Sequence, residues 1–516
     1  MNPTIKRAIL RPTTLTMLLA LAMIFGAILK LEQANSGVEV STHRIGPTPV
    51  TVFRSTQAAT GESLPVVVIS HGFAGSQQLM QPFAVTFARN GYLAVTFDYY
   101  GHGRNREPLA GDVTQVEGAT RFLLEQTADV VEFAFSLPGA GDEVISLGHS
   151  MASDIIVRYA KTDERVSATI AVSLFSPAVT AEAPDNLLVI VGGLEGFLRQ
   201  EALRVLGLVT DEPEEGVSVG NFADGSARRV VFADGVEHVG VLYSPESMRA
   251  AIDWANELTN RSGSGYYDSR GPALLALIAG IGLLAWPLSK LLPSVSQNPL
   301  GAALSWRQLL VATVLPALGT PILLWWFPAD FLGVLVGGYL AVHFLVYGLL
   351  TGICLWWIKR PRLTLSNAAT AFPRLAIASV LASLYTAGVI ALAMDTYVTS
   401  FAITAPRLPL VFLMLAGTLT YFLADEWVNR GVQAARGGHF FARVCFIVSL
   451  GIAVALSFEE LFFLLIIAVV IVIYFFIYGL FSRWIYRATG HPAVGAIANA
   501  TAFAWALAAV FPMLSG

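Results

Sequence analysis

The chain has 516 residues, of which 55% are hydrophobic and only 13% are charged, and its formal net charge at pH 7 is −4. The length exceeds that of one ordinary domain, and the mean hydropathy of +0.63 is typical of a membrane protein. The weak negative charge gives no indication of nucleic-acid binding. The two cysteines, Cys354 and Cys445, lie in apolar runs, so residues 31–270 can form no internal disulfide.

The N-terminal segment has the features of an export signal. Three basic residues precede an apolar run at residues 15–29. This order indicates either a cleaved signal sequence or a retained signal anchor. No small-x-small cleavage site stands out, so we expect residues 1–30 to form a retained anchor helix. The basic start predicts a cytoplasmic N-terminus and export of residues 31–270.

Residues 31–262 alternate strand-like and helix-like runs, which predicts an α/β fold with a mostly parallel sheet covered on both faces. After a two-stranded opening at residues 38–55, the predicted strands are 64–70, 93–97, 144–147, 168–174, 187–191 and 229–232. The predicted helices are about 80–90, 117–137 and 244–258, with an inserted helix at 197–206 before an acidic loop at 211–215.

One motif combines a strand end, a serine and a helix start. Gly148-His149-Ser150-Met151-Ala152 follows the apolar strand and precedes a helix-like run. A serine on such a tight turn presents its hydroxyl above the sheet edge, and small residues two places away let strand and helix pass closely. The helix N-terminus directs its partial positive charge toward the serine. Ala152 departs from the usual glycine by one methyl group.

Three further pieces accompany this motif in a fixed order. HGFAG occupies residues 71–75, DYYGHGR occupies residues 98–104, and His238 follows a short late strand. With these four pieces in this order, residues 38–262 resemble an α/β-hydrolase. The resemblance covers somewhat under half of the chain and implies a doubly wound, mostly parallel sheet that carries a serine hydrolase site.

The resemblance also implies roles for individual residues. Ser150 is the expected nucleophile, and His238 is the general base that takes its proton and returns it to the leaving group. The backbone N–H groups of Phe73 and Met151 are the expected oxyanion donors. Gly72 suits a chain that must approach the substrate closely.

The acidic partner of His238 is harder to assign. In this family the acid lies between the serine and the histidine in chain order. We favour Glu195, in the loop after the strand at residues 187–191. Asp185, just before that strand, is the first alternative, and Asp211 is the second.

Other polar motifs give no indication of a cofactor. The chain has no Cys-x-x-Cys, no His-Glu-x-x-His and no carboxylate cluster with ligand spacing, so we expect no metal. Gly101-x-Gly103 lacks the strand-then-helix setting of a dinucleotide site. We expect structural roles for His71, His102 and His149.

A flexible Gly/Ser-rich linker, residues 263–271, precedes a membrane domain at residues 272–516. Each of its eight apolar runs is near the ~20 residues that a membrane-spanning helix needs. These runs are about 272–292, 308–328, 331–357, 375–394, 408–424, 440–457, 461–482 and 493–513. With the hydrolase-like domain outside, the cytoplasmic segments carry fourteen lysines and arginines against four on the other side.

A few ionisable residues interrupt the apolar runs. We expect His343 to be a packed, hydrogen-bonded helix residue. Glu459 and Glu460 at an outer boundary, and Asp425 and Glu426 at an inner one, are expected to be solvated helix ends. Neither a repeated charged motif nor paired broken helices indicate a transporter.

These observations favour a membrane-tethered serine hydrolase that cleaves a small-molecule or lipid ester beside the bilayer. Two alternatives remain: an acyltransferase with the same triad, and a polytopic transport or assembly protein with a non-catalytic hydrolase-like domain. The sequence indicates neither a nucleic-acid partner nor an oligomeric state.

Overall fold

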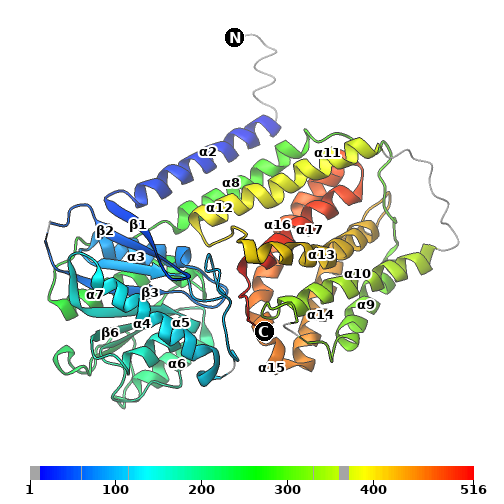
Figure 1. Ribbon diagram of the computed structural model, residues 1–516. Coiled ribbons are helices and arrows are strands. Elements are labelled where there is room, and N and C mark those ends of the chain that lie inside the picture. The colour runs from blue at the N-terminus through cyan, green and yellow to red at the C-terminus, as the bar shows by residue number, and fades with distance from the viewer. Residues whose placement is uncertain (1–11, 60, 114, 329–330, 360–370, 516) are drawn as a thin grey trace, which may run out of the picture. The chain divides into compact units, whose positions relative to one another are not determined.

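The computed structural model describes residues 12–59, 61–113, 115–328, 331–359 and 371–515 (Figure 1). Lys6, Arg7, Arg11, Arg360 and Arg362, which contribute to the predicted charge asymmetry, lie outside the described residues. The chain divides into two compact units. Of the described residues, the α/β unit comprises those within 26–275, 395–400 and 512–515, and the helical unit comprises those within 12–25, 276–394 and 401–511.

The α/β unit is built on one eight-stranded sheet with the order β1-β2-β4-β3-β5-β6-β7-β8. The first two strands are antiparallel to their neighbours, and β4, β3 and β5 to β8 run parallel. The strands are β1 (Val38–Ile45), β2 (Thr48–Ser55), β3 (Leu64–Ser70), β4 (Leu93–Phe97), β5 (Ala140–His149), β6 (Val166–Val172), β7 (Leu187–Gly192) and β8 (Arg228–Ala233). The predicted α/β class is therefore confirmed.

Helices cover both faces of this sheet, which explains the continuous apolar runs of its central strands. In β3, Val67 and Ile69 face one side and Val66 and Val68 face the other. One face is covered by α3 (Gln81–Arg89) and α7 (Pro245–Thr259), and the other by α4 (Arg121–Ser136), α5 (Met151–Ala160) and α6 (Gly196–Leu206). The inserted helix expected at residues 197–206 is α6.

Two distant segments complete the α/β unit. Ser400 donates its backbone N–H to Ser76 Oγ at 2.8 Å. Near the C-terminus, Met513 exchanges backbone hydrogen bonds with the loop after β4: its N–H donates to Gly101 O, and its carbonyl accepts from Leu109 N. The loops after β3 and β4 are therefore braced by parts of the chain far away in sequence.

Among the described residues, nine helices are long and apolar enough to cross a membrane, including a helix that is interrupted by a π-turn at Leu384–Val389. The nine are α2 (Pro12–Ala34), α8 (Gly271–Ser289), α9 (Trp306–Leu323), α10 (Gly337–Lys359), the interrupted helix made of α11 (Phe372–Ser383) and α12 (Ile390–Tyr397), α13 (Leu408–Asn429), α14 (Gly438–Leu456), α16 (Phe463–Thr489) and α17 (Pro492–Val510). The four-residue α15 (Phe458–Leu461) lies between α14 and α16. These helices fit a membrane protein.

Small residues bring helices of the helical unit into close contact, as is common in membranes. A Cβ on Gly417 of α13 would lie 2.1 Å from the carbonyl oxygen of Ala341 in α10, and one on Gly348 would lie 2.6 Å from Tyr421 N. His343 of α10 is buried, with its Nε2 3.1 Å from Ser449 Oγ. Its predicted packed, hydrogen-bonded role is confirmed.

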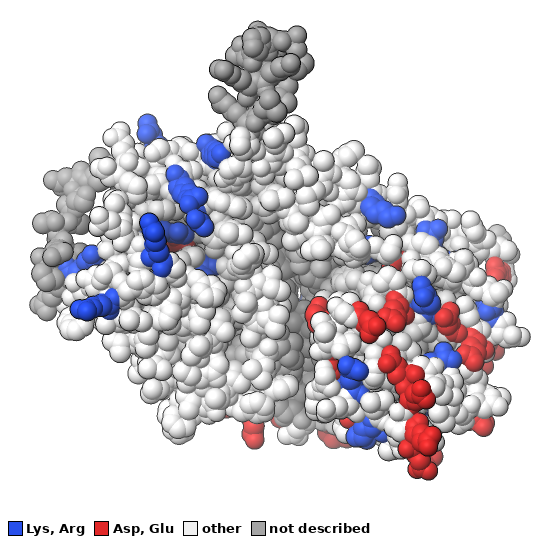
Figure 2. Space-filling view, turned by 180° about the vertical axis from the view of Figure 1, so that it is seen from behind, with Lys and Arg blue, Asp and Glu red and all other residues white. Residues whose placement is uncertain are grey.

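The charged side chains are unevenly distributed between the two units. On the face drawn in Figure 2, Asp and Glu side chains gather on the α/β unit, whereas most of the helical unit is uncharged. An uncharged surface of this extent is typical of helices that face lipid, and a charged surface is typical of a domain in water.

Candidate active site

The serine motif forms the turn between β5 and α5. Ser150 has φ 56° and ψ −117°, a backbone conformation that non-glycine residues rarely adopt. Its N–H donates to Val172 O at 2.9 Å, which fixes the turn to the neighbouring strand. A Cβ on Gly148 would lie 2.7 Å from Ala152 O, so the small residue there is needed for the close strand–helix approach. This is the nucleophile-elbow geometry that the sequence pattern predicts.

The turn after β3 lies directly against the serine. A Cβ on Gly72 would lie 2.9 Å from Ser150 Cβ and 3.0 Å from His149 Nδ1. Phe73, one of the two predicted oxyanion donors, is the next residue. Met151, the other, is the first residue of α5, where a backbone N–H has no acceptor within its own helix.

The structure brings together the serine, the histidine and the favoured acid. His238 Nε2 lies 2.9 Å from Ser150 Oγ. His238 Nδ1 lies 2.5 Å from Glu195 Oε1. The three side chains come from turns at the carboxyl ends of β5, β7 and β8, which meet at one edge of the sheet.

Two hydrogen bonds fix Oε2, the oxygen of the Glu195 carboxylate that does not face His238. Oε2 accepts a hydrogen bond from Ser173 Oγ at 2.8 Å and from Gly192 N at 2.6 Å. The Glu195 side chain is 6% exposed, so these donors replace the water that a free carboxylate would bind. Ser173 has φ +55°, again a strained conformation.

The two alternative acids lie elsewhere. Asp185 precedes β7, at the opposite end of that strand from Glu195, and its carboxylate lies beside Gly225. Asp211 lies in the exposed acidic loop. Of the three candidate acids, the structure brings only Glu195 to His238.

Ser173 was missed in the sequence. Its position directly after β6, at the same sheet edge as the serine turn, is the signal that could have identified it. We expect Ser173→Ala to lower kcat about tenfold with little change in KM, since a hydrogen bond to a charged group contributes ~1.5–3 kcal/mol and the Ser173 hydroxyl is directed at Glu195. Steady-state ester kinetics provide the measurement.

Ser176→Ala is the matched control, because Ser176 also donates to a carboxylate, Asp154 Oδ1 at 2.5 Å, outside the triad. An equal fall in kcat for both variants would contradict a specific role for Ser173.

His149 supports the loop that carries His238. Its Nε2 lies 2.9 Å from the carbonyl oxygen of His238, so this nitrogen is the donor. The two rings lie 4.8 Å apart between centroids. Burial, followed by the nearby His238, lowers the pKa of His149 to about 3, so it is neutral at physiological pH. This agrees with the structural role expected from the sequence.

This depressed pKa has a consequence for acid stability. In the unfolded chain the histidine takes up a proton near its ordinary pKa of 6.5, whereas the folded protein resists protonation down to about 3. The unfolding free energy should therefore fall as the pH is lowered through this window. We expect His149→Gln, which keeps a donor without a titrating group, to lose less thermal stability than wild type between pH 7 and pH 5.

Thermal unfolding of the full-length protein at the two pH values measures this difference. His43→Gln is the control, because it makes the same replacement at an exposed residue of β1. A wild-type pH dependence in His149→Gln would contradict the assignment.

The remaining motif residues organise the loops around the site. His71 Nε2 accepts from Tyr99 N at 3.1 Å, and burial lowers the pKa of His71. Asp98 accepts from the backbone N–H groups of Gln77 and Arg104. His102 Nδ1 lies 2.8 Å from Tyr100 O. These contacts tie the loops after β3 and β4 together without any contact to Ser150 Oγ.

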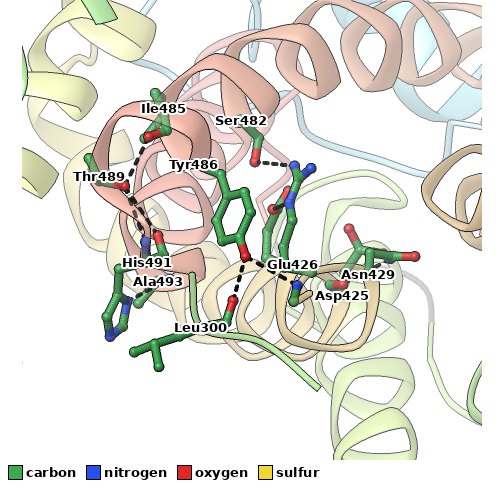
Figure 3. Close-up of polar contacts among 12 residues, drawn as sticks. Leu300, Asp425, Glu426, Asn429, Ser482, Ile485, Tyr486, Thr489, His491 and Ala493 are labelled. Carbon is green, nitrogen blue, oxygen red and sulfur yellow. Dashed lines mark hydrogen bonds and ion pairs between the residues drawn. The ribbon is translucent and has the colours of Figure 1, made fainter. Parts of the chain in front are cut away.

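A second polar cluster lies in the helical unit (Figure 3). Because α13 continues to Asn429, beyond the apolar run, Asp425 and Glu426 lie inside the helix and are 4% and 0% exposed. The expectation that they are solvated helix ends is therefore wrong. Glu426 Oε2 accepts from Arg430 Nε at 2.7 Å, and Arg430 Nη2 donates to Ser482 Oγ at 3.0 Å. Glu459, by contrast, is exposed as expected.

This cluster also holds potential metal ligands. Ligand atoms of Asp425, Glu426 and His439 lie within 4.8 Å of one another. The sequence showed no such grouping, because His439 belongs to another helix. Arg430 pairs with Glu426, however, and Arg443 Nη2 lies 3.9 Å from Asp425 Oδ2. Since two guanidinium groups already balance the two carboxylates, a dication would add uncompensated buried charge. The contacts describe an ion-pair network that joins α13, α14 and α16.

Comparisons with known proteins agree with the fold of the α/β unit. Residues 61–209 match the family model described as serine aminopeptidase, S33, which spans Ser150 and Glu195 and ends before His238. No curated protein matches the sequence.

Three of the solved structures that are similar to this chain share low sequence identity with it. A hypothetical protein from Pseudomonas aeruginosa is 13% identical, with 43% of this chain and 95% of that one covered and a TM-score of 0.33. A membrane phospholipase A described as a bacterial virulence factor is 14% identical, with 50% and 96% covered and a TM-score of 0.33. The thioesterase domain from the curacin biosynthetic pathway is 14% identical, with 42% and 99% covered and a TM-score of 0.29.

The family match and the strand order thus lead to the same conclusion. A parallel sheet whose fifth strand ends in a nucleophile elbow is the framework of the α/β-hydrolases. The chain therefore contains an α/β-hydrolase domain, joined in one polypeptide to a unit of long apolar helices.

Proposed function

We propose that the α/β unit is a serine hydrolase that cleaves an ester through an acyl-enzyme. The observation that carries this proposal is the continuous series of contacts from Ser150 Oγ through His238 to Glu195 Oε1, at 2.9 Å and 2.5 Å. A serine hydroxyl, an imidazole and a buried carboxylate in this order provide a nucleophile, a base and a group that orients the base.

The chemistry follows from the position of each group. Ser150 Oγ attacks the ester carbonyl carbon while His238 Nε2 takes its proton. The negative oxygen that develops lies toward the backbone N–H groups of Met151 and Phe73, which stabilise it. His238 then gives the proton to the departing alcohol, and the acyl group stays on Ser150. Water, deprotonated by His238, attacks this acyl-enzyme and releases the acid.

Glu195 makes this cycle possible without exchanging protons itself. Its Oε1 accepts from His238 Nδ1–H, which leaves Nε2 free to act as a base. The negative carboxylate also stabilises the imidazolium that forms when Ser150 is deprotonated.

We further propose that the long apolar helices hold this domain at a bilayer, on its extracytoplasmic side. The excess of basic residues in the segments between alternate helices supports this orientation. A cysteine introduced at exposed Ser136 should react with a membrane-impermeant maleimide in intact cells. Labelling only after cell lysis would contradict this orientation.

Other activities of the same site are distinguishable. An acyltransferase would pass the acyl group to an added alcohol or amine in preference to water, so product analysis separates the two. The matched family model carries an aminopeptidase description, which makes release of an N-terminal residue a second outcome to measure. A non-catalytic transport or assembly protein would turn over neither esters nor peptides.

Covalent trapping tests the proposal directly. The full-length protein, incubated with a fluorophosphonate, should gain one adduct that peptide mapping locates on Ser150. The rate of ester hydrolysis should fall in proportion to the fraction of protein that is labelled. An unlabelled protein, or an adduct on another serine with activity intact, would refute the serine hydrolase proposal.

A further inference from the structure

Four large apolar side chains are exposed beside the triad. Phe175, Leu194, Phe197 and Val239 are 55%, 67%, 67% and 45% exposed. Exposed apolar residues that occur singly need no explanation, but a group of them at one site indicates a surface that binds something. We call these four residues the apolar rim.

Each member of the apolar rim is tied to a residue of the catalytic machinery. Leu194 and Val239 directly adjoin Glu195 and His238 in the chain. Phe197 is the second residue of α6, two positions after Glu195, and Phe175 lies two positions after Ser173.

The turns that carry the rim are themselves joined together. Ser173 Oγ donates to Glu195 Oε2, and Leu194 N donates to Val236 O at 3.0 Å. The rings of Phe175 and Phe197 lie 5.9 Å apart between centroids, within the range of an aromatic pair. The four rim residues therefore lie on three hydrogen-bonded loops, those after β6, β7 and β8, and two of them, Phe175 and Phe197, contact each other.

The rim offers almost no polar chemistry to a ligand. Its side chains have no hydrogen-bonding group, and the two neighbouring carboxylates are already engaged. Glu195 is buried and bonded on both oxygens, and Glu237 accepts the backbone N–H groups of Val239 and Gly240. Such a surface attracts hydrocarbon and does not select a charged or sugar-like group.

We propose that the apolar rim binds a hydrocarbon chain of the substrate, which makes the preferred substrates long-chain esters. The proposal rests on the serine hydrolase function and specifies its substrate class. The chain lies over Phe175 and Phe197 while the ester carbonyl sits at Ser150 Oγ. Exposed phenyl and branched aliphatic groups then lose contact with water only when a long-chain substrate is bound.

The expected effect follows from the transfer of methylene groups out of water. Each CH₂ buried against the rim should raise kcat/KM about threefold, and the increase should stop when the chain extends past the rim. Ten-carbon esters should therefore exceed acetyl esters by about a hundredfold or more, because several methylenes contact the rim.

Kinetics of the full-length protein in lipid nanodiscs test this. One series varies the acyl chain of p-nitrophenyl esters from two to twelve carbons, and a second varies the alcohol of alkyl acetates. The ratio of variant to wild-type kcat/KM is compared at each length, so that partition of the ester into the bilayer cancels. For Leu194→Ala combined with Phe197→Ala, this ratio should fall steadily with chain length, to about one-tenth or less for ten carbons.

Val40→Ala is the control, because Val40 is also an exposed apolar residue but lies on β1, the outermost strand on the side of the sheet away from β8. Its ratio should stay near one at every length. A length-dependent fall in the acyl series alone places the acyl chain on the rim, and a fall in the alcohol series alone places the alcohol chain there. A ratio that is the same at all lengths in both series would overturn the proposal.

These outcomes are separable from failure of the proposed function. Fluorophosphonate labelling and hydrolysis of p-nitrophenyl acetate by wild type test the serine chemistry without a long chain. A protein that passes both but shows no dependence on chain length retains the hydrolase function and loses the rim proposal. Thermal unfolding of the double variant should match wild type, because both replaced side chains are two-thirds exposed.

Discussion

Ser150→Ala should lower kcat for ester hydrolysis by about a millionfold, to the limit of detection, since removal of the nucleophile of a triad eliminates the covalent route completely. The change deletes only Oγ, whose contact in the fold is His238 Nε2 at 2.9 Å. The strained backbone at Ser150 is held by its N–H bond to Val172 O and by the neighbouring glycines, which the variant retains. Steady-state kinetics with an activated ester measure the effect.

Thermal unfolding should show that the Ser150→Ala variant folds, because the change removes one hydroxyl oxygen and leaves the backbone hydrogen bond of the turn in place. Ser136→Ala, at the exposed end of α4, is the control that should keep full activity. Residual turnover within tenfold of wild type would mean that another group attacks the ester, and the triad assignment would fail.

Sequence patterns predicted the parts of the site that depend on local geometry. The strand–turn–helix at Ser150 follows from glycine and small residues at fixed offsets, and Gly72 is required beside it for the same steric reason. The order of strands fixes where each loop emerges, so the positions of Glu195 and His238 at one edge follow from the fold.

The parts that were missed depend on contacts between distant residues. The chain alone does not show that Ser173 and Gly192 hold the second oxygen of Glu195, or that His149 donates to the backbone of His238. Neither interaction requires a residue type that a motif would reveal, because serine is common and a backbone N–H has no sequence signal.

In the helical unit, too, the sequence predicted the local features and missed the contacts between distant residues. Hydropathy located the helices, because each carries an apolar run close to the length that a membrane-spanning helix needs. It placed Asp425 and Glu426 at a boundary, since charged residues end an apolar run. The helix continued instead, because Arg430 on the next turn and Arg443 on α14 compensate the carboxylates. A hydropathy window averages over consecutive residues of one helix, so it does not detect charge compensation by residues of another helix.

Glu195→Gln should lower kcat by about ten thousandfold while leaving the fold and KM nearly unchanged, by analogy with acid-to-amide changes in other triads. The orientation of the new amide is determined by its neighbours. Ser173 Oγ and Gly192 N both donate to the Oε2 position, so the amide oxygen should occupy it. The NH₂ group then faces His238 Nδ1, and two donors cannot share that contact.

His238 relieves this conflict by moving its proton to Nε2, so that Nδ1 accepts from the amide. In that tautomer Nε2–H points at Ser150 Oγ and cannot take its proton, so the base is lost although every side chain remains in place. The pH dependence of kcat in Glu195→Gln should therefore differ from that of wild type, in addition to the fall in kcat itself. Asp185→Asn, which alters the alternative acid before β7, should keep wild-type kinetics. A large loss in that variant, with Glu195→Gln active, would transfer the role to Asp185.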